Sequence, residues 1–260
     1  MAREEIIFER RPPLAIVTLN RPQSYNALTW AMYDRLNEIC TLVQADSQVR
    51  VMLVRGSGDR AFSTGTDIVQ FQSFNGVQDG IEYERRIERT FSAIESLSKP
   101  TIAAIEGYAA GAGAMVALVC DLRYGSTTSK FSIPIARTLG NCLTVANHAR
   151  LADLIGPARA KELLYRGRTV DAQEAKSLGL LSEVTPAGTA FDFAVKIADE
   201  IATHAPLTLL TTKEALRRLQ RERGNPVRDE DLVAKAYASE DFAEGVRAFI
   251  AKRRPIFRGR

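Results

Sequence analysis

Residues 107–121 read GYAAGAGAMVALVCD. The run TIAAIEG at 101–107 leads into this stretch, which carries no charge before Asp121. Small residues allow close backbone approach, and the first N–H groups of a helix lack intrahelical acceptors. We therefore expect a strand at 101–107, a tight turn, and a helix over 112–119 whose first N–H group is open to a ligand. Close packing of a helix on a strand demands the same small residues and remains an alternative.

A second turn of this kind is AFSTGTDI at 61–68, which follows a strand ending at Gly56. Small polar residues around Gly65 let a ligand approach the main chain, although an ordinary strand-to-helix turn has the same composition. We expect Asp67 to brace the turn through a hydrogen bond to the backbone. If N–H groups from the two turns converged, they would form an oxyanion hole for a thioester carbonyl.

The remaining chain repeats an order of strands and helices. Strands are expected at EEIIFER, LAIVTL, VRVMLVRG, DLRYGS and KFSI, with a turn at Arg11-Pro12-Pro13. Helices are expected at 28–45, 78–97 and from about Leu143, and 168–184 reads as strand, short helix and strand. From about Ala190 only helical segments follow, at 190–203, 207–222, 230–239 and 241–253. This segregation predicts an α/β core followed by a helical C-terminal third.

Composition narrows the classes of protein to which the chain can belong. The chain has 260 residues, 45% of them hydrophobic and 25% charged, which is ordinary for a globular protein with one core and an appendage. No apolar run reaches the ~18 residues of a membrane span, and the charged N-terminus is unlike a signal peptide, so we expect a cytoplasmic protein. Three cysteines without CxxC spacing and two histidines predict neither a disulfide framework nor a metal site.

Positive charge gathers at the C-terminus. The stretch VRAFIAKRRPIFRGR at 246–260 has no acid, and its basic residues are Arg247, Lys252, Arg253, Arg254, Arg258 and Arg260. Such a stretch suits a phosphate-bearing ligand, nucleic acid or an acidic neighbouring subunit, and a simply solvated end is the alternative. We do not expect nucleic acid to be the partner.

Five separated motifs, taken together, resemble the enoyl-CoA hydratase/isomerase (crotonase) superfamily in order and spacing. They are NRPQSYNAL at 20–28, AFSTGTDI at 61–68, KPTIAAIEGYAAGAG at 99–113, LVCDLRY at 118–124 and GLLSEV at 179–184. The resemblance implies an α/β fold, a crotonase-like spiral of strand-strand-helix turns with a C-terminal helical trimerisation region. It divides the chain into an acyl-CoA-binding core at 1–190 and a helical oligomerisation region at 191–260.

The resemblance also implies the site. The backbone N–H groups of Thr66 and Ala112 would form the oxyanion hole. Coenzyme A, as part of the substrate rather than a tightly bound cofactor, would contact Ser24, Tyr25, Ala27, Thr64, Gly65, Asp67, Ile68 and Gly111. Phe249 and Lys252 match a C-terminal element that meets the phosphate end from a neighbouring subunit. The partners implied are an acyl-CoA thioester and copies of the same chain, as a homotrimer or dimer of trimers.

The acid-base residues depart from the family pattern. The positions that match its two glutamates hold Met115 and Ile135, and no glutamate lies between Gly107 and Lys161. General acid-base groups contribute ~10²–10⁴-fold each, so we do not expect standard hydration. Asn141 is a candidate pocket residue, with a helix N-cap as its alternative. Cys142 is either a nucleophile or a structural thiol.

The sequence thus predicts an enzyme that polarises the thioester carbonyl of an enoyl- or other acyl-CoA with non-standard acid-base residues. The resemblance implies a lyase or isomerase, and hydrolysis is a further possibility. A non-catalytic acyl-CoA-binding protein is the alternative, because neither Met115 nor Ile135 can titrate.

Overall fold

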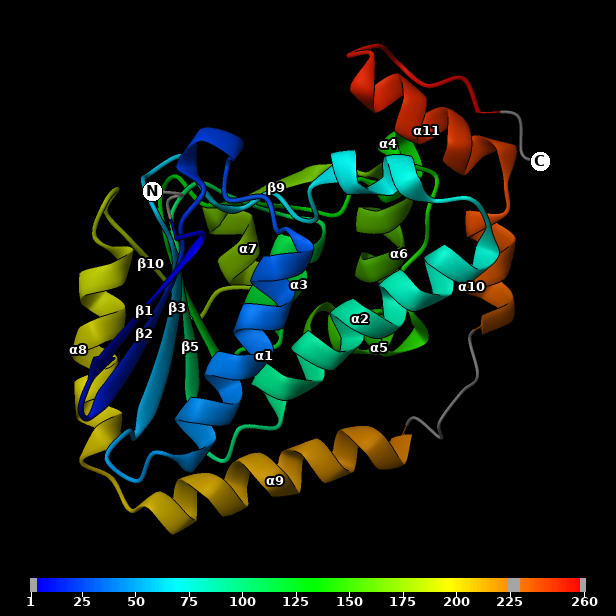
Figure 1. Ribbon diagram of the computed structural model, residues 1–260. Helices are drawn as coiled ribbons and strands as arrows, with labels where there is room; N and C mark the ends of the chain where they lie inside the picture. The colour runs from blue at the N-terminus through cyan, green and yellow to red at the C-terminus, as the bar shows by residue number, and fades with distance from the viewer. Residues whose placement is uncertain (1–3, 224–229, 258–260) are drawn as a thin grey trace.

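The structure, a computed structural model, describes residues 4–223 and 230–257 (Figure 1). A six-stranded sheet has the order β1-β2-β3-β5-β7-β10, in which only β1 and β2 are antiparallel. Its strands are β1 (Ile6–Arg11), β2 (Leu14–Leu19), β3 (Val51–Gly56), β5 (Thr101–Ile105), β7 (Leu122–Ser126) and β10 (Glu183–Thr185).

A four-stranded sheet has the order β4-β6-β8-β9. Its strands are β4 (Ala61–Ser63), β6 (Tyr108–Ala110), β8 (Lys130–Ser132) and β9 (Thr169–Asp171). The chain passes from β3 to β4, from β5 to β6 and from β7 to β8, each time leaving the large sheet for the small one before a helix. This is the spiral of strand-strand-helix turns predicted from the sequence, and the prediction is confirmed.

Helices cover both faces of the six-stranded sheet. They are α1 (Trp30–Ala45), α2 (Val77–Glu95), α3 (Ala112–Leu118), α4 (Ile135–Thr138), α5 (Val145–Ile155), α6 (Pro157–Arg166), α7 (Ala172–Leu178), α8 (Ala190–Ala202), α9 (Pro206–Arg223), α10 (Glu230–Tyr237) and α11 (Glu240–Ile250). Among the described residues, two 3₁₀ helices, η1 (Pro22–Ser24) and η2 (Ile68–Ser73), interrupt the loops beside the small sheet.

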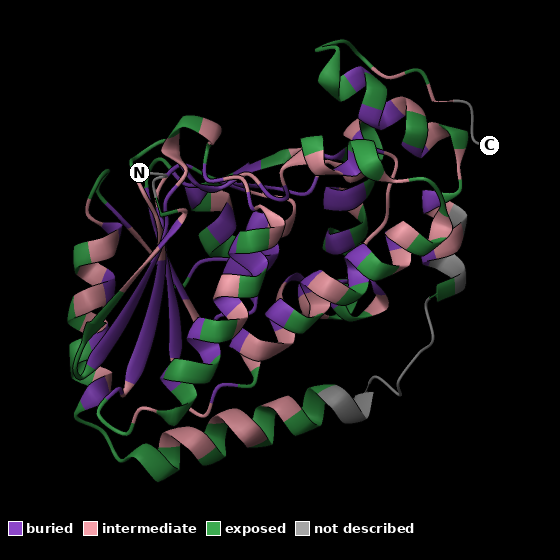
Figure 2. Ribbon diagram, in the orientation of Figure 1, coloured by how far each residue is buried: buried purple, intermediate pink, exposed green. Residues whose placement is uncertain are grey.

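The alternating direction of side chains along the buried strands explains why helices cover both faces of the sheet. In β3, Met52 and Val54 belong to the large hydrophobic core that includes α1 and α2, whereas Val51 and Leu53 face the smaller core beneath α8. Successive side chains of a strand point to opposite faces, so a strand apolar on both faces needs a cover on each. Figure 2 shows these strands buried between α8 on one side and α1 on the other.

Several boundaries differ from the sequence expectation. The strands β4 and β6 have three residues each and lie inside segments predicted as turns, because pairing with neighbouring strands can order a segment too short to show alternation. Helix α5 begins at Val145, and its N-cap is Thr144, whose hydroxyl accepts from the Asn147 N–H at 3.2 Å. The N-cap alternative for Asn141 is therefore wrong.

The C-terminal helices attach to the core through aromatic side chains. The centre of the Tyr237 ring of α10 lies 6.1 Å from the centre of the Tyr83 ring and 4.7 Å from that of Phe242 of α11. Phe71 of η2 contacts Phe242 and so belongs to the same aromatic cluster. A Cβ atom at Gly80 of α2 would overlap the Tyr237 ring, so glycine makes room for this contact. Helix α10 is thus packed against α2.

Helix α9 lies apart along one edge of the molecule (Figure 1). Leu216 and Leu219, three residues apart on it, are 57% and 52% exposed. No helix of the described residues is both long and apolar enough to cross a membrane. Within the same residues, no group of three or more histidine, cysteine or acidic side chains is placed to share a metal ion.

Candidate functional site

Two glycine-containing turns meet at one edge of the small sheet. Strands β4 and β6 are parallel neighbours, so the turns that follow them emerge side by side. Gly65 has a φ of +98°, and a Cβ there would lie 3.0 Å from the Ala110 oxygen and 3.1 Å from the Ala112 nitrogen. The glycines therefore permit both the turn conformation and the close approach.

The turns leave two N–H groups available near this contact. Leu28 donates to Gly65 O at 2.7 Å and Asp67 donates to Leu28 O at 2.9 Å, which fixes the backbone on either side of Thr66. Ala112 is the first residue of α3, where an N–H group has no acceptor within its own helix. Among the described residues, neither the Thr66 nor the Ala112 N–H has an intramolecular acceptor.

Two buried phenols hold the side chain of Thr66. Its hydroxyl lies 2.7 Å from the Tyr33 hydroxyl of α1 and 2.9 Å from the Tyr83 hydroxyl of α2. Burial raises the pKa of both tyrosines above the usual value, so both remain neutral hydrogen-bonding groups. The turn that contains Thr66 is thereby tied to α1 and α2.

A cavity of about 490 Å³ opens beside the two turns. All predicted site residues except Lys252 line it: Ser24, Tyr25, Ala27, Thr64, Gly65, Thr66, Asp67, Ile68, Gly111, Ala112, Asn141 and Phe249. The cavity has the size and mainly apolar lining of a small-molecule site. The role of each residue toward CoA stays a prediction.

The loop before α1 forms one rim of the cavity. Tyr25 adopts a φ of +51°, and the Arg60 guanidinium lies 4.1 Å from the centre of its ring. The buried Asn26 side chain donates to Ala61 O at 2.7 Å and joins this loop to β4. Asp67 accepts from the Val69 N–H at 3.3 Å and pairs with Arg21 at 3.0 Å, so its predicted bracing role is confirmed.

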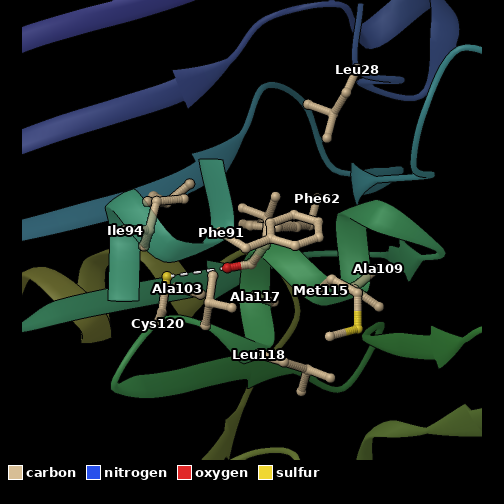
Figure 3. Packing of buried hydrophobic residues seen from close by; sticks show 14 of the residues in the cluster. Leu28, Phe62, Phe91, Ile94, Ala103, Ala109, Met115, Ala117, Leu118 and Cys120 are labelled. Atoms are coloured by element: carbon tan, nitrogen blue, oxygen red, sulfur yellow. Dashed lines mark hydrogen bonds between the residues drawn. The ribbon is translucent and has the colours of Figure 1, made fainter. Parts of the chain in front are cut away.

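The two positions that the resemblance aligns with glutamates also line the cavity. Met115 on α3 is 1% exposed and packs in the main hydrophobic core, close to Ala109 (Figure 3). Ile135 is the first residue of α4 and is partly buried. Neither side chain can move a proton.

Asparagine side chains bring polarity to the cavity wall. Asn141 donates from Nδ2 to the Tyr237 hydroxyl at 3.4 Å, while its Oδ1 is buried without a partner. Asn147 is fully buried and accepts at Oδ1 from Arg150 at 2.8 Å, but its Nδ2 has no partner. Buried polar atoms are usually satisfied, so these two are available to a bound group. Asn141 thus belongs to the cavity wall, and Cys142 lines it beside Asn141.

Sequence reasoning missed one carboxylate in the wall. Glu84 of α2 lines the cavity, is 3% exposed, and accepts a 2.7 Å hydrogen bond from the Tyr237 hydroxyl. The helical spacing of Glu84, Ile87 and Phe91 was a usable signal, because it puts an acid on the same face as two buried apolar residues. The family resemblance points only to the positions of Met115 and Ile135, which lie on other helices.

The basic C-terminal segment lies mostly outside the cavity. Phe249 of α11 lines it, whereas Lys252, with a φ of +51°, lies beyond the end of α11 and does not. Arg253 pairs with Glu244 at 2.5 Å, so part of the positive charge is balanced within the chain. Arg258 and Arg260 fall outside the described residues.

Known proteins share this chain's sequence and fold. The family model described as enoyl-CoA hydratase/isomerase matches residues 9–260. A crotonyl-CoA hydratase of Syntrophomonas wolfei is 32% identical over 99% of both chains, and a 2,3-dehydroadipyl-CoA hydratase of Escherichia coli K12 is 31% identical over 98% of this chain and 99% of its own length.

Solved structures agree with this relationship. A methylmalonyl-CoA decarboxylase in complex with 2-nitronate-propionyl-CoA superposes over 100% of both chains with a TM-score of 0.89 and 27% identity. An enoyl-CoA hydratase/carnithine racemase from Magnetospirillum magneticum gives a TM-score of 0.80 at 32% identity, covering 100% of this chain and 97% of its own. The chain therefore belongs to the enoyl-CoA hydratase/isomerase family.

Proposed function

We propose that this family member binds an acyl-CoA thioester and polarises its carbonyl with the N–H groups of Thr66 and Ala112. The observation that carries the proposal is the pair of N–H groups without intramolecular acceptors among the described residues, on adjacent turns that border one cavity. Two such donors stabilise an oxygen that gains negative charge as an enolate or tetrahedral intermediate forms.

The substrate class that we favour is an enoyl-CoA. The relatives in Syntrophomonas wolfei and Escherichia coli are named hydratases of crotonyl-CoA and 2,3-dehydroadipyl-CoA, which supports an unsaturated acyl thioester. The CoA portion would run along the rim formed by Ser24, Tyr25 and Ala27, where the cavity lining includes exposed residues.

The acid-base groups are the non-standard part of the proposal. Met115 and Ile135 line the cavity and carry no proton that could be exchanged near neutral pH. Proton transfer must then use a group elsewhere in the wall, and addition of water by the usual pair of glutamates is not what we expect. A non-catalytic acyl-CoA-binding protein is the alternative, and measured turnover of any acyl-CoA would exclude it.

We also propose that the helical segment from 191 onward mediates self-association. Leu216 and Leu219 expose apolar surface on α9, a helix that lies apart from the sheets. Exposed apolar side chains at helical spacing suit burial against another helix. A trimer or dimer of trimers is the assembly that the family resemblance favours.

The test removes one N–H group without removing a side chain. Ala112→Pro deletes the donor at the first position of α3, where proline is well tolerated. We expect kcat on the best substrate of an enoyl- and acyl-CoA panel to fall about 10²–10³-fold. Ala112→Gly keeps the N–H and is the matched control. Undiminished turnover in the proline variant would exclude the oxyanion hole, and binding without any wild-type turnover would favour the non-catalytic alternative.

A further inference from the structure

Glu84 is a buried carboxylate on the cavity-facing side of α2. Ile87 and Phe91 follow it at the spacing of one helical face, and all three line the acyl cavity. Glu84 is 3% exposed, in a wall otherwise rich in apolar side chains. Burial of an ionisable group costs free energy unless it is hydrogen-bonded, and such groups concentrate at functional sites.

A phenol positions this carboxylate. The Tyr237 hydroxyl donates to Glu84 Oε1 at 2.7 Å and accepts from Asn141 Nδ2 at 3.4 Å. Burial and the nearby charge of Glu84 raise the pKa of Tyr237 well above its usual value, so the phenol keeps its proton and stays a donor. Tyr237 therefore joins two cavity residues from different elements, with one carboxylate oxygen of Glu84 fixed by it.

The same turn of α2 lies against the oxyanion hole. Tyr83, the residue before Glu84, contacts the Thr66 side chain at 2.9 Å through its hydroxyl. Thr66 supplies one of the two N–H donors of the proposed hole. Thr66, Ala112 and Glu84 line the same cavity, so a thioester held by the two N–H groups would place its α carbon in that cavity.

A second cavity borders Glu84 on its other side. It has a volume of about 1150 Å³ and lies among α2, α5, α9 and α10, and both Tyr83 and Glu84 line it as well. Exposed residues such as Glu82 and Arg85 also line this second cavity, so it opens to solvent. Glu84 thus lies in the wall between the acyl cavity and a solvent-connected one.

We propose that Glu84 is the catalytic base that removes and returns a proton at the α carbon of the bound acyl-CoA. The inference rests on the proposed function, because it requires the oxyanion hole at Thr66 and Ala112. It assigns the proton-transfer role to α2 instead of to the positions of Met115 and Ile135.

Removal and return of the α proton need no co-reactant. The Glu84 carboxylate takes the α proton, the C–H electron pair forms a carbon–carbon double bond to C1, and the carbonyl π pair moves onto the oxygen held by the two N–H groups. Return of the proton to the α carbon regenerates the substrate. With a 3-enoyl thioester, return of the proton to the γ carbon gives the 2-enoyl isomer, so one base suffices for a double-bond shift.

The experiment compares Glu84→Gln with the wild-type full-length protein. The substituted amide would keep the shape and an acceptor for Tyr237 but could not take a proton. We would follow deuterium uptake at the α carbon of butyryl-CoA in D₂O by mass spectrometry, and conversion of 3-hexenoyl-CoA by absorbance. Both rates should fall at least about 10²-fold, while the dissociation constant for butyryl-CoA changes less than about twofold.

Matched variants separate chemistry from folding. Glu38→Gln, at an exposed position of α1 that lines neither cavity, should leave both rates unchanged. Glu84→Asp, which retains a carboxylate, should recover part of them. If Glu84→Gln does not fold, 3-octynoyl-CoA is used on the wild type. Its allene, formed by the same proton shift, adds the base as an enol ester, and peptide mass spectrometry should find the adduct on Glu84.

The outcomes distinguish this inference from the function it rests on. Full exchange by Glu84→Gln, an adduct on another residue, or butyryl-CoA binding by the wild type with no α exchange overturns the role of Glu84 alone. Failure of the wild type to bind any CoA thioester overturns the proposed function and the inference together.

Discussion

The hydroxyls of Tyr33 and Thr66 lie 2.7 Å apart, and the Tyr83 hydroxyl reaches the same threonine oxygen at 2.9 Å. A single side-chain oxygen thereby links α1 and α2 to the turn that offers the Thr66 N–H. The side chain of this residue supports the fold, while its backbone is the part proposed to meet the substrate.

Thr66→Val should therefore lower stability more than activity. The variant keeps the N–H but leaves two buried phenols without their shared partner, which costs about 1–3 kcal/mol. Urea unfolding should report the loss, whereas kcat should change less than about threefold. Thr66→Ser, which retains the hydroxyl, is the control. A large fall in kcat at unchanged stability would contradict this division of roles.

Gly65→Ala should damage the oxyanion hole directly. Its Cβ would crowd the Ala110 oxygen and the Ala112 nitrogen at 3.0 and 3.1 Å, so the two turns must separate. We expect kcat to fall about 10²-fold or more. Gly58→Ala is matched in backbone strain, with a φ of +78°, but its Cβ would meet only Pro22 at 3.7 Å, and kcat should hold. Equal losses in both variants would point to strain alone.

Alkylation of Cys142 should report on occupancy of the cavity. Burial raises the pKa of Cys40 and Cys120 to about 12, so at about pH 8 both remain protonated and slow to alkylate. Cys142 is partly exposed and lines the cavity. Iodoacetamide should label Cys142 first, and butyryl-CoA should slow that labelling about tenfold. An alkylation rate of Cys142 that does not change when butyryl-CoA is added would show that the acyl group binds elsewhere.

The unpartnered amide atoms predict an acyl preference. Asn147 Nδ2 and Asn141 Oδ1 are buried without partners in the cavity wall. An acyl chain with a hydroxyl or carbonyl that satisfies them should bind about tenfold more tightly than the plain chain of equal length. Asn147→Leu should remove this preference, measured by calorimetry on the two thioesters. Tighter binding of the plain chain by the wild type would contradict it.

Surface charge on α9 should change the oligomeric state. Leu216→Glu with Leu219→Glu puts two carboxylates where exposed apolar side chains now lie. Sedimentation velocity should show the wild-type assembly dissociating in the variant, because a buried helix interface does not tolerate unpaired charge. Leu42→Glu on α1, at a side chain that is 50% exposed, is the control and should not alter the assembly.

Much of the fold was readable from residues 51–54 and similar runs, because a strand buried on both faces leaves a continuous apolar pattern. The spiral and the small-residue turn at Ala112 followed from the motif series. The short strands β4 and β6 did not, since three residues hold no periodicity and pairing alone orders them.

The site was readable only in part. The N–H groups of Thr66 and Ala112 lie beside glycines, so their place at the cavity could be predicted from the sequence. The same holds for the lining residues Ser24, Tyr25 and Ala27. Glu84 was not, because a glutamate on an amphipathic helix is usually solvated, and only tertiary packing of α10 on α2 buries it. Its partner Tyr237 lies 153 residues later in the chain.

The Tyr237 ring packs against Gly80, where any side chain would overlap it. This contact bears on the order in which the parts of the cavity wall come together. The turns that carry Thr66 and Ala112 are synthesised well before Tyr237. The phenol that donates to Glu84 therefore becomes available only after both turns have been made. A larger residue at position 80 would keep the Tyr237 ring out of this site, so one glycine on α2 decides whether α10 completes the cavity wall.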